Sequence, residues 1–196
     1  ICGIQIVSIS DGVDTSRDGW EIAAGIHGIM NEHYSRTLAA NVRRGQRYST
    51  EQGYSNGDEC FGYRSEAVPG TERGAHRKPR RKTVVDPEQA EWVRRIFRWY
   101  VEERLSIQRI CRMLTEQGVP KDHRASTPRW YTDLVKKVLR NPKYIGNWPW
   151  GKTKRQRNPV NGRVRQVPTP GGGICSNRPE LRIVDDGLFW EAQKRL

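Results

Sequence analysis

Segments with clear helix start and stop signals follow one another in the middle of the chain, and they restrict this part to a small helical domain. In the first, Asp86 offers an N-cap oxygen, Pro87 suits the first helical position, and Gln89 stands three residues after the cap, as in a capping box. A second helix is predicted from Ser106 to a stop at Gly118. Apolar residues recur at helical spacing in both, so both helices are predicted to pack on a core.

A third helix is predicted to begin near Tyr131–Thr132 and to end at Asn141–Pro142, because the residue before a proline disfavours helical backbone. Short strand-like pieces follow over residues 144–148 and 160–167, and another amphipathic helix is predicted within residues 181–196. Three helices followed by a β-ribbon is a shape shared by helix-turn-helix and winged-helix DNA-binding proteins.

Charge is distributed unevenly along the chain. Residues 1–60 hold 5 Lys/Arg and 8 Asp/Glu, a net charge of −3, whereas residues 61–196 hold 30 and 14, a net charge of +16. The stretch 129–143 contains a single acid, and residues 152–165 contain none. A solvated surface of high pI is the plain alternative. However, uncompensated basic runs are electrostatically costly without a polyanion, so the sequence predicts a nucleic-acid partner.

The candidate DNA-contacting side chains are cations of these stretches and of a basic run at residues 76–82. Pro79 interrupts that run, which is predicted to be a solvated arm that contacts phosphates when nucleic acid is near. The candidates are Arg77, Lys78, Arg80, Arg81, Lys82, Arg129, Lys136, Lys137, Arg140, Lys143, Lys152, Lys154, Arg155 and Arg157. Trp130 and Tyr144 are predicted to pack beneath this surface.

The first part of the chain has a different pattern. Residues 3–10 alternate apolar and small or polar side chains, which predicts a strand with one face well buried. Apolar residues from Ile22 to Val42 then recur at helical spacing, and the pattern predicts one helix of roughly 25 residues. Residues 48–85 are rich in Gly, Ser, Pro and charge and are predicted to be a linker that carries the basic arm.

Composition and spacing argue against several kinds of protein and site. No apolar run approaches the roughly 18 residues of a membrane span, and no leader supports secretion. Cys2, Cys60, Cys111 and Cys175 form no CxxC pair and have no His at metal-ligand spacing, so a zinc site wholly inside this chain is not expected. No other metal and no cofactor are predicted. No His lies beside a Ser or Cys in a nucleophile setting, so a self-contained active site is not expected either.

Strings spread over nearly the whole chain resemble parts of large serine recombinases, in the order found in that family. They are ISDGVDTS (9–16), EHYSR (32–36), FGYR (61–64), VDPEQAEWVRRIF (85–97), LRNPKYIG (139–146) and RIVDDGLF (182–189). The first two resemble the last strand and the long helix of the catalytic domain. The third resembles the tag that opens the following DNA-binding domain, and the others resemble that domain itself.

The resemblance implies site-specific DNA recombination, as in phage integrases and the recombinases of mobile elements. Members of the family cut both strands at two attachment sites through a serine nucleophile, form a phosphoserine link, rotate half of the complex and religate, without nucleotide or metal at the active site. The Tyr-x-Arg-x-Ser motif of that serine is absent here. The chain is therefore expected to be a fragment that is inactive alone.

The resemblance also implies partners and site residues. Duplex DNA carrying attachment sites is the expected partner, the full-length protein is expected to act as a homodimer or homotetramer on DNA, and a cytoplasmic, bacterial or phage-encoded protein without a membrane partner is expected. Arg36 is a candidate for contacting the scissile phosphate. Asp11, Gly12 and Thr15 match a family loop that is better explained by a turn and local hydrogen bonds.

The predicted architecture is an α/β remnant, made of a strand and a long helix, followed by a mainly α-helical DNA-binding domain with a small β-ribbon. The parts are residues 1–47 (end of the catalytic domain), 48–85 (linker) and 86–196 (DNA-binding domain). A free-standing helix-turn-helix-like regulator without catalytic activity is the alternative. An RNA-binding protein is a third possibility, although no RNA-module aromatic signature is present. A Tyr-x-Arg-x-Ser motif encoded upstream of Ile1 would favour the recombinase. A start codon adjacent to Ile1 would favour the regulator instead.

Overall fold

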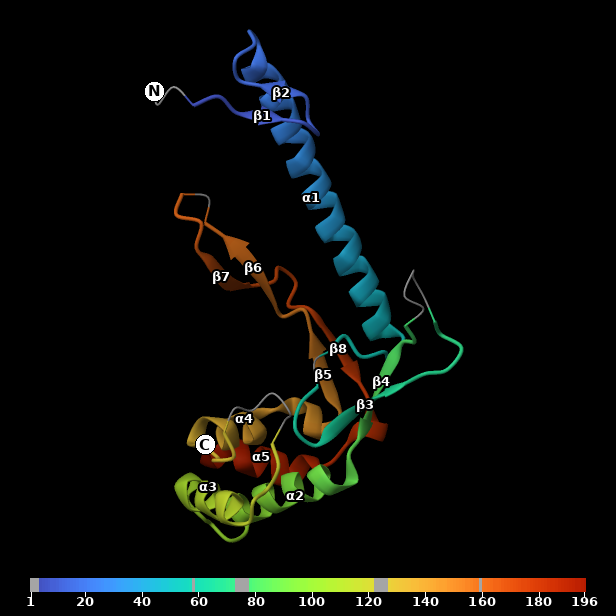
Figure 1. Cartoon of the computed structure of the whole chain (residues 1–196). Helices are drawn as coiled ribbons and strands as arrows, with labels where there is room; N and C mark the ends of the chain where they lie inside the picture. The colour runs from blue at the N-terminus through green and yellow to red at the C-terminus, as the bar shows by residue number, and fades with distance from the viewer. Residues whose placement is uncertain (1–3, 58, 73–77, 122–126, 159) are drawn as a thin grey trace. The chain divides into compact units, whose positions relative to one another are not determined.

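The structure is a computed structural model that describes residues 4–57, 59–72, 78–121, 127–158 and 160–196. The described residues contain α-helices and two-stranded antiparallel sheets (Figure 1). The chain divides into two compact units, Ile1–Tyr48 and Ser49–Leu196. The fold is thus a mixture of helix and small sheets.

The first unit contains a short hairpin and most of a long helix. The elements are β1 (Val7–Ser8), which pairs with β2 (Val13–Asp14), and α1 (Trp20–Glu51), which is 32 residues long. Within the described residues 4–10, the predicted strand is reduced to two residues. Ile4, Ile6 and Ile9 are 77%, 62% and 98% exposed, so the prediction of a buried face is wrong. A ladder of two residue pairs is too small to cover these side chains.

Local hydrogen bonds hold the loop that follows β2. The Asp14 carboxylate accepts a hydrogen bond from the backbone N–H of Ser16 (3.0 Å) and another from Gln5 Nε2 (2.9 Å). These bonds lower the pKa of Asp14 to about 2. Thr15 Oγ1 accepts from a backbone N–H at 2.9 Å, and Gly12 adopts a φ of 65°. The structural roles predicted for Gly12 and Thr15 are therefore confirmed.

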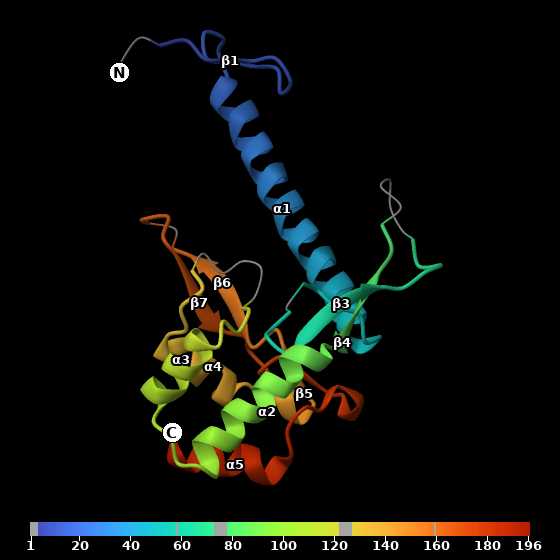
Figure 2. The ribbon, with the colours of Figure 1, turned by 60° about the horizontal axis from the view of Figure 1, so that its bottom comes forward.

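In the second unit, the helices pack on one another around a common core (Figure 2). They are α2 (Pro87–Val101), α3 (Ile107–Glu116), α4 (Thr132–Arg140) and α5 (Asp186–Arg195), together with the 3₁₀ turns η1 (Pro142–Ile145) and η2 (Pro179–Leu181). Helix α2 contacts the other three, and α4 contacts α3 and α5. The core is aromatic: the Phe97 ring lies 6.2 Å from that of Tyr144 and 6.0 Å from that of Phe189, centroid to centroid.

The helix boundaries follow the predicted signals. Asp86 caps α2 by accepting a hydrogen bond from the Gln89 backbone N–H (3.1 Å), and Ser106 caps α3 in the same way. The reciprocal half of the predicted capping box does not form. Instead, the Gln89 side chain accepts from the Gly62 backbone N–H at 3.0 Å, and the Asp86 N–H donates to the Gly62 carbonyl. Gly118 ends α3 with a φ of 62°.

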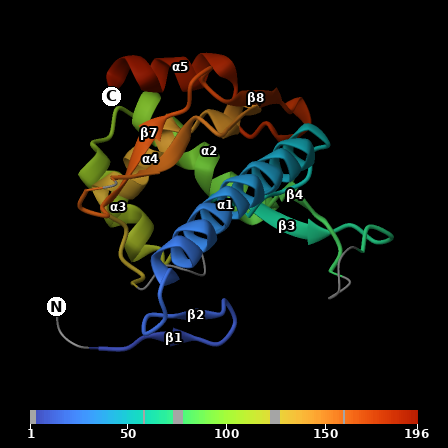
Figure 3. The ribbon, with the colours of Figure 1, turned by 90° about the horizontal axis from the view of Figure 1, so that it is seen from above.

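The strands of the second unit form two ribbons. One is the sheet of β3 (Tyr63–Ala67) and β4 (Arg81–Val85); the other contains β5 (Asn147–Trp150) paired with β8 (Ile174–Asn177) and β6 (Thr153–Arg157) paired with β7 (Val164–Pro168). The first ribbon lies in the segment where composition predicts a linker. Tyr63 of this ribbon is nevertheless buried, and its hydroxyl donates to the carbonyls of Lys143 (2.9 Å) and Leu181 (2.8 Å). Figure 3 shows the two ribbons leaving the helices on different sides.

The junction between the β5–β8 and β6–β7 ladders requires a glycine. Gly173 has a φ of 78°, and a Cβ at this position would lie 2.4 Å from the Trp150 carbonyl oxygen. We expect Gly173→Ala to destabilise the ribbon by about 2 kcal/mol or more, because it adds backbone strain to a steric overlap with backbone. Faster amide hydrogen exchange in β6 and β7 measures this effect.

Gly171→Ala is the matched control for that substitution. Gly171 has a φ of 83°, but nothing lies within 4 Å of the Cβ that would be added. This variant is therefore destabilised by backbone strain alone, by about 1 kcal/mol. Equal changes in exchange rate for the two variants would show that the contact with Trp150 has no effect.

Candidate nucleic-acid interface

The charged residues of helix α4 are spaced so that their side chains share one face of the helix. Val135, Val138 and Leu139 point into the core, and the exposed residues Asp133, Lys136, Lys137 and Arg140 are spaced three and four apart, so they share the opposite face. None of the three cations forms an ion pair with another described residue. Residues 134–179 contain 11 Lys/Arg and no Asp/Glu, so Asp133 is the one acid near these cations in the sequence.

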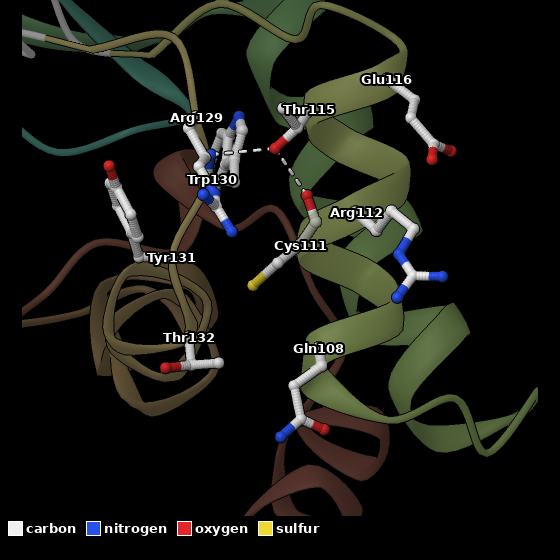
Figure 4. A pocket seen from close by; sticks show the side chains of 9 residues that line it. All are labelled: Gln108, Cys111, Arg112, Thr115, Glu116, Arg129, Trp130, Tyr131 and Thr132. Atoms are coloured by element: carbon white, nitrogen blue, oxygen red, sulfur yellow. Dashed lines mark hydrogen bonds between the residues drawn. The ribbon is translucent and has the colours of Figure 1, made fainter.

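A cleft of about 480 Å³ runs between α3 and the start of α4 (Figure 4). Gln108 and Arg112 line it from α3, and Arg129 and Thr132 line it from the other side. The two sides are tied together because Thr115 Oγ1 donates to a carbonyl of its own helix (2.8 Å) and accepts from the Trp130 backbone N–H at 3.0 Å. The cleft therefore has a fixed base and two guanidinium groups at its walls.

Arg112 is a residue that the sequence analysis missed. It follows Gln108 by four residues, so the two share one face of α3, and this spacing was the available signal. Cys111 forms part of the same cleft, and burial raises the pKa of its thiol. The thiol is thus held in its neutral form, and the charge of the cleft is set by the arginines and by Glu116.

An aromatic ring with two cations beside it precedes α4. Tyr131 is 47% exposed, and the Lys121 ammonium and the Arg129 guanidinium lie 5.7 and 5.8 Å from its ring centroid. Lys121 Nζ also donates to the Arg129 carbonyl at 2.7 Å. This contact holds the backbone just before α4 and keeps positive charge at the beginning of the helix, beside the face that carries Lys136.

The β6–β7 ladder carries cations on both of its faces. Arg155 and Arg157 alternate with Lys154 along β6, and Arg165 lies opposite Gln156 on β7, on the same face as Lys154. Arg155, Arg157 and Arg165 are exposed, as is Lys152 just before the ladder, and Lys154 is half-buried. The ribbon therefore extends the uncompensated charge of α4 onto a second element.

The basic run at residues 76–82 is not a free arm over its described part. Arg81 and Lys82 belong to β4, and the Arg81 Nε donates to Ser65 Oγ at 2.7 Å. The Arg80 guanidinium and the Lys82 ammonium lie 4.6 and 5.6 Å from the ring centroid of Tyr54. Lys78 is exposed, and Arg77 lies outside the described residues. The prediction of a solvated arm is wrong from Arg80 onward, because these cations have partners in the fold.

Lys143 does not lie on the exposed basic surface. It is only 9% exposed in η1, and its Nζ lies 4.5 Å from the ring centroid of the buried Trp148. Trp130 and Tyr144 are 4% and 1% exposed, so both are buried, as predicted. The Tyr144 hydroxyl donates to the Phe61 carbonyl at 2.8 Å, and burial raises its pKa well above the usual value.

Arg36 belongs to the first unit, on α1. Its guanidinium forms an ion pair with Glu32 one turn earlier, at 2.6 Å, and both side chains are more than half exposed. Such a pair stabilises an exposed helix only slightly. The side chain is therefore accessible and loosely held.

A family model and a solved structure match the chain. A family model described as Recombinase matches residues 87–196. Among solved structures, one described as the crystal structure of an LSR–DNA complex is 16% identical, with a TM-score of 0.46, and the match covers 79% of this chain and 38% of that chain. The chain thus spans well under half the length of that protein. None of the curated proteins matches.

No helix in the described part of the chain is both long and apolar enough to cross a membrane. The family match includes α2, α3, α4, the second ribbon and α5, and so includes all the residues of the charged face and of the cleft lining. It extends over more than half of the chain and confirms the resemblance to recombinases. The chain belongs to the Recombinase family.

Proposed function

We propose that the second unit binds duplex DNA at recombination sites, and that the protein of which it is part exchanges DNA strands through a serine–phosphodiester intermediate. The observation that carries the proposal is the charged face of α4, because its three cations have no ion-pair partner among the described residues. Exposed cations that are not paired with carboxylates repel one another, and a polyanion relieves that repulsion. The family membership is what selects DNA as that polyanion.

The geometry supports a division of roles within this surface. Helix α4 is short and exposes side chains along one face, as a helix that enters a major groove does. Arg112 and Arg129 line the cleft beside the first turn of α4 and are proposed to contact backbone phosphates. Arg155 and Arg157 on the ribbon are proposed to contact the phosphates of a neighbouring stretch. Arg36 is proposed to serve the cleavage step, at the scissile phosphate, in an assembly of two or four copies.

A salt titration of DNA binding tests the proposal. About six phosphate contacts make the affinity for duplex DNA fall by roughly 10³-fold between about 50 and 200 mM salt, because bound counterions are released. Fluorescence anisotropy with a labelled 30-base-pair duplex, a length of about three helical turns, measures the dissociation constant at each salt concentration. An affinity that is constant over this range would contradict the proposal. An RNA duplex of equal length is expected to bind more weakly, since side chains cannot read its deep, narrow major groove.

A further inference from the structure

The charged face of α4 contains one residue of the opposite sign. Asp133 lies in the first turn of the helix, exposed, and Lys136, Lys137 and Arg140 follow it at three, four and seven residues on the same face. It is also the only acid in residues 129–179. A surface that contacts only phosphates gains nothing from a carboxylate at this place, because phosphate and carboxylate repel each other.

The Asp133 carboxylate makes no hydrogen bond or ion pair with any other described residue. This is notable because Lys136 and Lys137 stand at the helical spacings at which ion pairs form elsewhere in the chain: Glu91 pairs with Arg94 at 3.3 Å and with Arg95 at 3.6 Å. The carboxylate oxygens are therefore available to an outside donor. A carboxylate accepts hydrogen bonds only, so the group that it recognises must donate.

The major groove offers few donors to such a group. Only the amino groups of cytosine (N4) and adenine (N6) donate there, and a carboxylate that accepts from cytosine N4 is the established pairing geometry for Asp and Glu. Phosphate oxygens and the other base-edge atoms of the groove are acceptors or methyl groups, so they cannot donate a hydrogen bond to a carboxylate. An acid among cations on a groove-facing helix thus rejects most sequences and favours one base.

We propose that Asp133 is a specificity-determining residue, whose carboxylate accepts a hydrogen bond from the amino group of a cytosine in the major groove. The inference rests on the proposed function, since it needs α4 to enter that groove. The simpler role of an acid in a first helical turn is to interact with the helix dipole. Helix α2 supplies the comparison, because Glu88 is the acidic residue of its first turn.

The experiment compares the whole chain with its Asp133→Asn and Glu88→Gln variants. Both substitutions remove one negative charge from the first turn of a helix, but only the first lies on the charged face of α4. A preferred sequence is first selected with the unmodified chain from a pool of duplexes with a randomised centre. Dissociation constants are then measured for that duplex and for variants with each base pair replaced in turn. Thermal melting of each protein checks that it is folded.

We expect the unmodified chain to discriminate one C·G pair by about 5- to 100-fold. Asp133→Asn is expected to abolish that preference or to shift it to adenine, which an amide contacts through two hydrogen bonds, and Glu88→Gln to leave it unchanged. The inference is overturned if Asp133→Asn tightens binding to all duplexes by one common factor, or if Glu88→Gln changes the preference equally. An unmodified chain that binds no duplex would overturn the proposed function itself, together with this inference.

Discussion

Replacing Lys136, Lys137 and Arg140 together with alanine is expected to weaken the binding of duplex DNA by about 100-fold. Each of these cations is exposed on α4 and lacks an ion-pair partner among the described residues, so each is free to contact the nucleic acid. About 1 kcal/mol for each contact gives about 3 kcal/mol, and each 1.4 kcal/mol changes the dissociation constant tenfold. The slope of log affinity against log salt is expected to fall by up to about three as well.

The matched control replaces Arg94, Arg95 and Arg98 on α2. This variant loses the same three charges from one helix, but each of these arginines lies within 3.6 Å of the Glu91 carboxylate. If net charge alone governed binding, the two triple variants would weaken it equally, and that result would contradict the assignment of the surface to α4. Binding by the α2 variant is expected to stay within about fivefold of the unmodified chain.

Phe97→Ala is expected to lower the free energy of unfolding of the second unit by about 4 kcal/mol. Phe97 is fully buried, and its ring packs against those of Tyr144 and Phe189, which belong to η1 and α5. Removing the ring therefore leaves a cavity where three elements meet, and a large part of the stability of an ordinary domain is lost. Urea denaturation followed by tryptophan fluorescence measures the change.

Val160→Ala serves as the reference for that measurement. Val160 is 93% exposed, so its truncation is expected to change the unfolding free energy by less than about 0.5 kcal/mol. A loss below about 1 kcal/mol for Phe97→Ala would mean that the core collapses around the missing ring. That outcome would contradict the tight aromatic packing between α2 and η1.

The sequence predicts best what is decided locally. Asp86, Ser106 and Gly118 mark helix ends through hydrogen bonds or backbone angles that involve only their neighbours, and the structure has all three in those roles. The exposed face of α4 follows from its period in the same way. Arg112 was missed because its importance comes from the cleft with Arg129, which is formed by two segments that are separated in the sequence.

Other features depend on contacts between distant residues and were not predicted. Lys143 has the sequence context of an exposed cation, but η1 turns its side chain over the buried ring of Trp148. The β3–β4 sheet lies in a segment rich in Gly and Ser. Contacts with residues far along the chain, such as the hydrogen bonds of the Tyr63 hydroxyl to two carbonyls, show that the segment packs on the core. Hydrogen bonds between residues so far apart in the chain produce no local pattern in the sequence.

The contacts of residues 61–63 show that the second compact unit extends beyond the region that matches the family model. The family match begins at Pro87, yet the Phe61 carbonyl accepts from a buried hydroxyl of the matched region, and the Gly62 N–H donates to Gln89. A chain that begins at Pro87 would lack the Tyr63 ring, which packs against the rings of Tyr144 and Trp148. It would also leave the buried Tyr144 hydroxyl without its hydrogen-bond acceptor. The region that matches the family model is therefore not a complete folding unit, and truncation at Pro87 is expected to destabilise the core.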